Sequence, residues 1–297
     1  ALAPRRDTAS PLLVGLLLRL GAVAWAGGGA MPGDATFYRT LAGRLAEGHG
    51  YTWAWPDGAV TAAAHYPVGL PALLAGFDRV LGPLFGLSPG GLVAHPWALQ
   101  ALLAASSTSV VWFVHRAVAR SGGGRPVARV AAWLCALHPA LVLYAPALMS
   151  EIPTATLLAA SVWLAALARD ASPGRRWGLL AVLGVVIGLA TLVRPQSVVM
   201  APVLGLLAAS PGREGGPFAR RRRGAACGAA LLVVGVALAT CAPWTDRNCR
   251  EMGRCALVSV NGGWNLVIGT PPAGRGGWGG GPGRNTRRRE VGGAAQD

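Results

Sequence analysis

Long apolar runs separated by short polar segments divide most of the 297-residue chain. A transmembrane helix needs about 20 mainly apolar residues, and seven segments come near that length. They are residues 11–27, 92–118, 127–144, 151–168, 178–193, 196–209 and 224–243. Residues 67–86 are apolar but contain Pro71, Asp78 and Pro83, as in a re-entrant or interfacial helix. The pattern predicts an all-α fold, a polytopic membrane helical bundle of about seven transmembrane helices, with juxtamembrane helices in the first outer loop.

The first apolar segment, residues 11–27, follows Arg5 and Arg6 and has the character of either a signal peptide or a first transmembrane helix. A cleaved signal peptide usually precedes a soluble mature domain. Here the next polar loop leads back into apolar segments, so we expect a helix that stays in the protein. Residues 1–10 would then be a cytoplasmic N-terminus.

Composition supports a membrane protein, because 53% of the residues are hydrophobic, 13% are charged and the mean hydropathy is +0.44. All 27 basic residues are arginine, and the net charge is +15. A basic stripe on a soluble domain would suggest nucleic acid. These arginines instead lie in short loops between apolar runs, a pattern typical of membrane topology and of attraction to anionic headgroups. We expect membrane lipids and no nucleic acid as partners.

The arginine-rich loops also predict the orientation, because short cytoplasmic loops carry an excess of arginine. With the N-terminus inside, the loops at residues 116–129, 169–176 and 213–223 all fall inside. The opposite, extracytoplasmic side receives the loop over residues 28–66 and three later polar turns. The sequence thus predicts a multi-pass cell-membrane protein with a transmembrane bundle over residues 67–243, then an outer loop and mobile tail over residues 244–297.

The first outer loop, residues 28–66, concentrates polar side chains. Asp34 opens a helical pattern and is either a catalytic carboxylate, a helix N-cap, or both. Tyr38, one turn later on the same face, either contacts substrate or anchors the loop at the interface. His65 and Tyr66 precede the return to apolar sequence; His65 either binds a phosphate or metal, or is an ordinary hydrogen-bonded interfacial histidine.

Two charged residues stand at turns on the predicted outer side. Glu151 lies in the first turn of a helix that Ser150 is placed to cap. Its carboxylate is either stabilised by the helix dipole alone or contributes to a site beside Asp34. Arg194 lies between two apolar spans, away from the arginine-rich loops, and so requires an anionic partner. That partner is either a polyprenyl phosphate or ordinary lipid headgroups.

The segment after the last span adds further donors: Arg247, Asn248 and Asn261 can bind phosphate or sugar hydroxyls. Cys249 and Cys255 flank a polar stretch on the predicted outer side, a compartment that permits a disulfide. Tryptophans at positions 53, 55 and 264 either stack on a sugar ring or anchor in the aromatic belt.

Four sequence segments together resemble a known family. They are GDATFYRTLAGRLAEGHGY with HYPVGLPALLAG, LHPALVLYAPALMSEIPTATLL, GLATLVRPQSVVMAP, and APWTDRN followed by VSVNGGWNLVIGT. In this order they resemble the polyprenyl-phosphate-sugar-dependent membrane glycosyltransferases of the GT-C fold. These include protein O-mannosyltransferases and the lipid A aminoarabinose transferase, so the chain looks like a member of glycosyltransferase family 39.

The resemblance implies transfer of a sugar from a polyprenyl-phosphate donor to a hydroxyl of a glycan, lipid or protein, with inversion. It implies Asp34 as the catalytic carboxylate. From the residues themselves we expect Arg194 and Arg247 to bind the phosphate, with Glu151 and Tyr38 in support. No ligand set points to a metal, so no cofactor is predicted. The alternatives are a transporter or flippase for a lipid-linked or anionic solute, which would need an internal repeat, and a non-catalytic scaffold.

Overall fold

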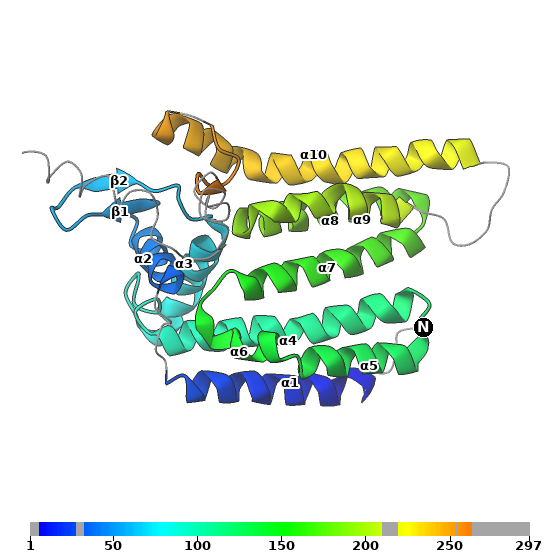
Figure 1. Ribbon diagram of the computed structural model, residues 1–297, viewed down its shortest axis with the longest axis horizontal. Coiled ribbons are helices and arrows are strands. Elements are labelled where there is room, and N and C mark those ends of the chain that lie inside the picture. The colour runs from blue at the N-terminus through cyan, green and yellow to red at the C-terminus, as the bar shows by residue number, and fades with distance from the viewer. Residues whose placement is uncertain (1–5, 28–32, 210–218, 254, 263–297) are drawn as a thin grey trace, which may run out of the picture.

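The computed structural model describes residues 6–27, 33–209, 219–253 and 255–262. Of the predicted outer loop and mobile tail, residue 254 and residues 263–297 lie outside these ranges. Long helices lie side by side as a bundle, and short elements gather at one end of it as a cap (Figure 1). The regular structure of the described residues is helical apart from one two-stranded sheet, which confirms the predicted all-α membrane fold.

Five described helices are long and apolar enough to span a membrane. Helix α1 (Arg6–Trp25) lies at one edge of the bundle and α10 (Ala219–Met252) at the other (Figure 1). Between them lie α4 (Pro96–Arg120), α7 (Glu151–Asp170) and α8 (Pro173–Val193). Helix α4 packs on both α1 and α7, while α8 packs on both α7 and α10.

The other two predicted spans are not straight transmembrane helices. The segment predicted over residues 127–144 is broken: α5 (Gly124–Ala136) and α6 (Pro139–Leu143) are bent by 46°, and a 3-10 turn η2 (Ala145–Ala147) follows. Counted as one span, this bent unit raises the total to six. The segment predicted over residues 196–209 forms a 3-10 turn η3 (Pro195–Val199) and the short helix α9 (Met200–Ala209). The described residues thus contain five spans, or six with the bent unit, where about seven were expected.

Glycines let the last helices approach closely. A Cβ on Gly184 of α8 would lie 2.7 Å from the Cβ of Val236, and one on Gly188 would lie 2.5 Å from the Cβ of Thr240. Gly205 of α9 meets Ala230 of α10 in the same way, at 2.7 Å from its Cα. Small residues at such contacts bring backbones together and maximise van der Waals packing, the main association force between helices in lipid.

The cap contains α2 (Asp34–Ala46), the antiparallel strands β1 (Thr52–Ala54) and β2 (Val60–Ala62), α3 (Gly69–Leu81) and the 3-10 turn η1 (Gly82–Phe85). A buried cluster joins it to the bundle, with Tyr38 and Leu70 of the cap against Leu99 of α4 and Ile152 of α7.

A buried carboxylate also fixes the cap. Asp78, 1% exposed, accepts hydrogen bonds from the backbone N–H groups of Gly90, Leu92 and Val93 at 2.8, 2.7 and 3.1 Å. Three donors to one carboxylate satisfy its buried charge. Asp78 therefore ties α3 to the chain that leads into α4.

Candidate active site

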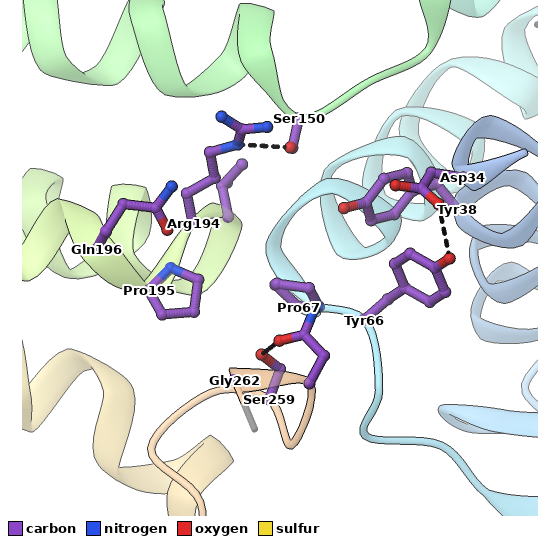
Figure 2. Close-up of a pocket in the computed structure, with 12 residues that line it drawn as sticks. Asp34, Tyr38, Tyr66, Pro67, Ser150, Arg194, Pro195, Gln196, Ser259 and Gly262 are labelled. Atoms are coloured by element: carbon purple, nitrogen blue, oxygen red, sulfur yellow. Dashed lines mark hydrogen bonds between the residues drawn. The ribbon is translucent and has the colours of Figure 1, made fainter. Parts of the chain in front are cut away.

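A polar cavity of about 480 Å³ opens where the cap meets the bundle (Figure 2). Its walls come from three parts of the chain: α2 with the segment before α3, the α7 and α8–η3 turns, and the segment after α10. The lining residues are Asp34, Tyr38, Tyr66, Pro67, Ser150, Val193, Arg194, Pro195, Gln196, Ser259, Asn261 and Gly262.

Asp34 is the first residue of α2, and its exposed side chain lies at the cavity. Its Oδ1 accepts a hydrogen bond of 2.7 Å from the Tyr66 hydroxyl (Figure 2). The N-cap interpretation of Asp34 is wrong, because Gly33 occupies that position with φ 92° and no side chain caps the helix. Asp34 thus has one oxygen held by a phenol, and its carboxylate is not committed to the helix.

The two cavity tyrosines are held in their neutral form. Burial, the hydrogen bond to Asp34 and the negative charge of Asp34 all raise the pKa of Tyr66. Burial also raises the pKa of Tyr38, more than the Ser150 hydroxyl and Arg194 lower it. A neutral phenol is a donor, so Tyr66 can orient Asp34 at neutral pH. The rings of Tyr38 and Tyr66 pack edge to face at 5.2 Å, which stiffens this wall.

Arg194 lies in the extended turn between α8 and η3, with φ −140° and ψ 112°. Its Nε donates to the Ser150 hydroxyl at 2.9 Å and its Nη2 donates to Oε1 of Glu151 at 2.5 Å. The expected capping role of Ser150 is wrong, since its side chain makes no cap hydrogen bond and instead accepts from Arg194. The turn before α7 therefore holds a guanidinium at the cavity wall.

A close backbone contact fixes the turn that carries Arg194. A Cβ on Gly69, at the start of α3, would lie 2.5 Å from the backbone nitrogen of Val193 and 2.6 Å from the carbonyl carbon of Leu192. Only glycine allows α3 to pack this tightly on α8. This close packing fixes the position of the Arg194 turn relative to the cap.

Glu151 lies behind Arg194 and outside the cavity lining. Its Oε1 pairs with Arg194, while its buried Oε2 has no hydrogen-bond partner among the described residues. Because Glu151 is in the first turn of α7, the helix dipole also stabilises its charge. The arrangement leaves Arg194 with a partly compensated positive charge, about a third of its side chain exposed.

The third wall comes from the segment after α10. The Ser259 hydroxyl donates to Oδ1 of Asn261 at 2.9 Å, and the Val260 N–H donates to the carbonyl of Ala64 at 2.9 Å. The amides of Asn261 and Gln196 both line the cavity and offer donors and acceptors suited to sugar hydroxyls. Figure 2 shows Ser259 facing the space between the Arg194 turn and the Tyr66 segment.

Three residues predicted to bind substrate lie outside the cavity lining. Arg247 donates to the backbone carbonyls of Ala63 at 2.6 Å and Tyr51 at 2.9 Å. Asn248 is fully buried and donates to the carbonyls of Ala256 and Val258, both at 3.1 Å. His65 is exposed and packs its ring on Tyr66 at 4.9 Å. The structure does not bring these side chains together with Asp34 and Arg194.

The end of α10 forms a clamp around the returning chain, made by Trp244, Thr245, Arg247 and Asn248. Trp244 Nε1 donates to the carbonyl of Val258 at 2.9 Å, and the Thr245 hydroxyl donates to that of Leu257 at 2.8 Å. A disulfide joins Cys249 and Cys255, as the sequence allows. Of the three tryptophans considered for sugar stacking, Trp53 packs on Phe37 at 4.9 Å, Trp55 is exposed on the hairpin, and Trp264 lies outside the described residues.

Sequence reasoning missed four polar or flexible parts of the cavity wall: Ser150 as a site residue, Gln196, Ser259 and Gly262. A signal was present, because each lies within or beside a segment that carries the family resemblance. Nothing in the residue types themselves marks a serine or glutamine as facing a cavity.

The cavity offers a carboxylate, a guanidinium, neutral hydroxyls and amides on facing walls. In the part of the chain that the structure describes, no group of three or more His, Cys, Asp or Glu side chains is arranged to hold a metal ion. The carboxylate, guanidinium and hydroxyls of the cavity are suited to proton transfer from a hydroxyl and to binding an anionic group.

A family model described as dolichyl-phosphate-mannose-protein mannosyltransferase matches residues 93–245, just over half of the chain. The matched region contains the Ser150–Glu151 turn and Arg194, and it ends within the α10 clamp. No curated protein and no solved structure matches the chain. The chain therefore belongs to the dolichyl-phosphate-mannose-protein mannosyltransferase family and is a membrane glycosyltransferase of the mannosyltransferase type.

Proposed function

We propose that this protein transfers a sugar from a polyprenyl-phosphate donor to an acceptor hydroxyl, with inversion at the anomeric carbon, in the cavity between cap and bundle. The observation that carries the proposal is that Asp34 and Arg194, far apart in sequence, line one cavity. The reaction needs a carboxylate near the nucleophile and positive charge near the departing phosphate, and these two side chains supply them.

In the proposed reaction, the acceptor oxygen attacks the anomeric carbon as the bond from that carbon to the phosphate oxygen breaks. Asp34 takes the hydroxyl proton, and the phosphate leaves on the polyprenyl chain with its added negative charge facing Arg194. An unperturbed aspartate has a pKa near ~3.9 and is a weak base, so orientation and leaving-group stabilisation contribute most of the acceleration.

The neighbours of these two residues have supporting roles. Tyr66 holds one Asp34 oxygen, which leaves the other free to accept the proton. Ser150 and Glu151 hold the Arg194 guanidinium at the wall. Asn261, Gln196 and Tyr38 contact sugar or acceptor hydroxyls. Arg247 and Asn248 act indirectly by fixing the segment that carries Ser259 and Asn261.

We propose that the cavity faces the extracytoplasmic side and that the N-terminus is cytoplasmic. Arg120 and Arg169, at the ends of α4 and α7, lie at the end of the bundle away from the cavity, where short arginine-rich loops favour the cytoplasm. Asp57→Cys and Arg175→Cys variants, made with Cys227 replaced, test this with a membrane-impermeant thiol reagent in intact cells. Labelling at position 57 alone is expected, and labelling at position 175 alone would reverse the orientation.

The central experiment is transfer from a radiolabelled polyprenyl-phosphate sugar by the purified protein in nanodiscs. Release of polyprenyl phosphate together with a β- or α-configured product of inverted stereochemistry is the expected result. Movement of the intact donor across vesicle membranes without sugar transfer would instead identify a flippase. Polyprenyl-phosphate mannose is the first donor to assay, given the family assignment.

A further inference from the structure

The broken span α5–α6–η2 leaves backbone carbonyls without helical partners inside the bundle. Pro139 begins α6 and Pro146 lies within η2, and neither has an N–H to donate. Irregular backbone at membrane depth is tolerated only where protein groups satisfy it. The carbonyls at these two breaks therefore need donors from other parts of the chain. The same span leads directly into the Ser150–Glu151 turn.

Three buried polar side chains from α1 and α4 meet those carbonyls. Arg19 donates to the carbonyls of Ala136 at 3.0 Å and Cys135 at 3.1 Å, at the end of α5. Ser107 donates to the carbonyl of Leu141 in α6 at 3.0 Å. Gln100 donates through Nε2 to the carbonyl of Pro146 in η2 at 2.7 Å.

These three side chains form one polar ladder, which we define as Arg19, Ser107 and Gln100. All three are 0% exposed, and Arg19 Nε also donates to the Ser107 hydroxyl at 2.8 Å. Charged and polar side chains inside a membrane are costly, so a set that is hydrogen-bonded along one broken span points to a specific role. Their combined effect is to fix the path of residues 135–146 against α1 and α4.

The chain between this ladder and the site carries strain. Leu148 has φ 47°, the only positive φ among the non-glycine residues that the structure describes. It is fully buried in the cluster that joins cap and bundle. A left-handed conformation at a bulky residue such as leucine persists only where its surroundings hold it. Ser150 and Glu151, which bind Arg194, follow directly.

We infer that Gln100 is a positioning residue: by holding the carbonyl of Pro146, it sets the turn that places Ser150 and Glu151 around the Arg194 guanidinium. Ser107 and Arg19 support the same span further from the cavity. The inference rests on the proposed function, in which Arg194 binds the phosphate of the lipid donor. Gln100 touches neither substrate nor cavity, so its effect passes through Arg194.

The test measures binding of polyprenyl phosphate, the proposed leaving group, to the full chain in nanodiscs. Gln100→Leu removes the donor and keeps the side-chain size. We expect binding to weaken about tenfold, because loss of the hydrogen bond to Pro146 shifts the turn that carries Ser150 and Glu151, and the guanidinium moves with them. The matched control is Thr108→Val on the same helix, since Thr108 is buried and, among the described residues, its hydroxyl donates within its own helix, to Ala104 at 2.8 Å. Its binding should stay unchanged.

A double-mutant cycle separates positioning from general stability. In a Glu151→Gln background, the added Gln100→Leu change should weaken binding less than twofold, because the residue through which it acts is already altered. An undiminished effect in that background, or wild-type binding by folded Gln100→Leu, would overturn the inference. If Gln100→Leu does not fold, Gln100→Asn, whose shorter amide draws away from Pro146, replaces it in the same cycle. Absence of polyprenyl-phosphate binding by the wild-type protein would instead contradict the proposed function.

Discussion

Two arginines at the same end of the bundle have opposite surroundings. Arg194 directs its donors to the Ser150 hydroxyl and the Glu151 carboxylate at the edge of a cavity. Arg247, in the α10 clamp, directs its donors to the backbone carbonyls of Ala63 and Tyr51 and lies over the rings of Trp244 and Tyr51, at 5.0 and 5.9 Å. A phosphate can replace or share the first set of partners. A phosphate cannot replace the backbone carbonyls bound by Arg247 without disrupting the local fold.

Polar residues on this side of the bundle thus form two groups. The cavity group is Asp34, Tyr66, Ser150, Arg194 and Asn261, and the clamp group is Trp244, Thr245, Arg247 and Asn248. The cavity group faces open space, and its members pair with other side chains, as Asp34 does with Tyr66. The clamp group pairs with backbone, as buried Asn248 does with Ala256 and Val258. We therefore expect changes in the cavity to reduce transfer and changes in the clamp to reduce stability.

The largest effect is expected for Asp34→Asn, which keeps the shape and removes the proton acceptor. Loss of a general base typically lowers rate by about 10²–10⁴-fold, and we expect kcat to fall within that range. The measurement is transfer of labelled sugar at saturating donor. Asp57→Asn is the matched control, since Asp57 is an exposed aspartate of the same cap outside the cavity lining and should transfer normally. Full activity of Asp34→Asn would remove the cavity group from the chemistry.

Arg194→Gln should follow, with kcat/KM for the donor lowered about 100-fold. Charge-assisted hydrogen bonds are worth about 1.5–3 kcal/mol, and this change removes the charge that meets the phosphate. Arg194→Lys should recover part of the loss, since the charge returns without the forked geometry. If Arg194→Gln lowers the unfolding temperature but transfers sugar at the normal rate, Arg194 has a structural role like that of the clamp residues.

Tyr66→Phe is expected to lower kcat about tenfold by releasing one Asp34 oxygen. Because the pKa of Tyr66 is raised, its phenol stays protonated below its ordinary pKa near ~10, and its contribution to stability is lost only as pH rises from there toward the higher folded value. The pH profiles of wild type and Tyr66→Phe should therefore run parallel from pH ~6 to ~9. A profile whose alkaline limb disappears in the variant would contradict this assignment.

The smallest effect on transfer is expected for Arg247→Gln. The change removes two charge-assisted hydrogen bonds, to the carbonyls of Ala63 and Tyr51, although the Tyr51 carbonyl keeps the Ala63 N–H at 3.0 Å. The free energy of unfolding should therefore fall by about 2–3 kcal/mol. Transfer per folded molecule should stay within about threefold of wild type. Thermal unfolding in detergent and transfer in nanodiscs measure the two quantities on one preparation. A loss as large as that of Arg194→Gln, without a loss of stability, would restore Arg247 to the phosphate site.

Tertiary contacts changed several interpretations of local sequence. Ser150 followed by Glu151 and Pro153 has the pattern of a helix start, and α7 does begin there. The serine side chain nevertheless binds Arg194, because a guanidinium from a turn far along the chain lies within reach and needs an acceptor. Asp34 departs from its capping interpretation because Gly33 takes the N-cap position, and its carboxylate pairs with the distant Tyr66.

The sequence by itself determined the membrane class, the order of the helices and the segments that resemble the family, because hydropathy and motif order are properties of neighbouring residues. Only the tertiary structure decided that one predicted span is broken and held by Arg19, Ser107 and Gln100. The tertiary structure alone also showed that Arg194 lines the cavity whereas Arg247 binds backbone carbonyls. The physical reason is that a buried donor takes the nearest acceptor in space, and that acceptor lies in another part of the chain.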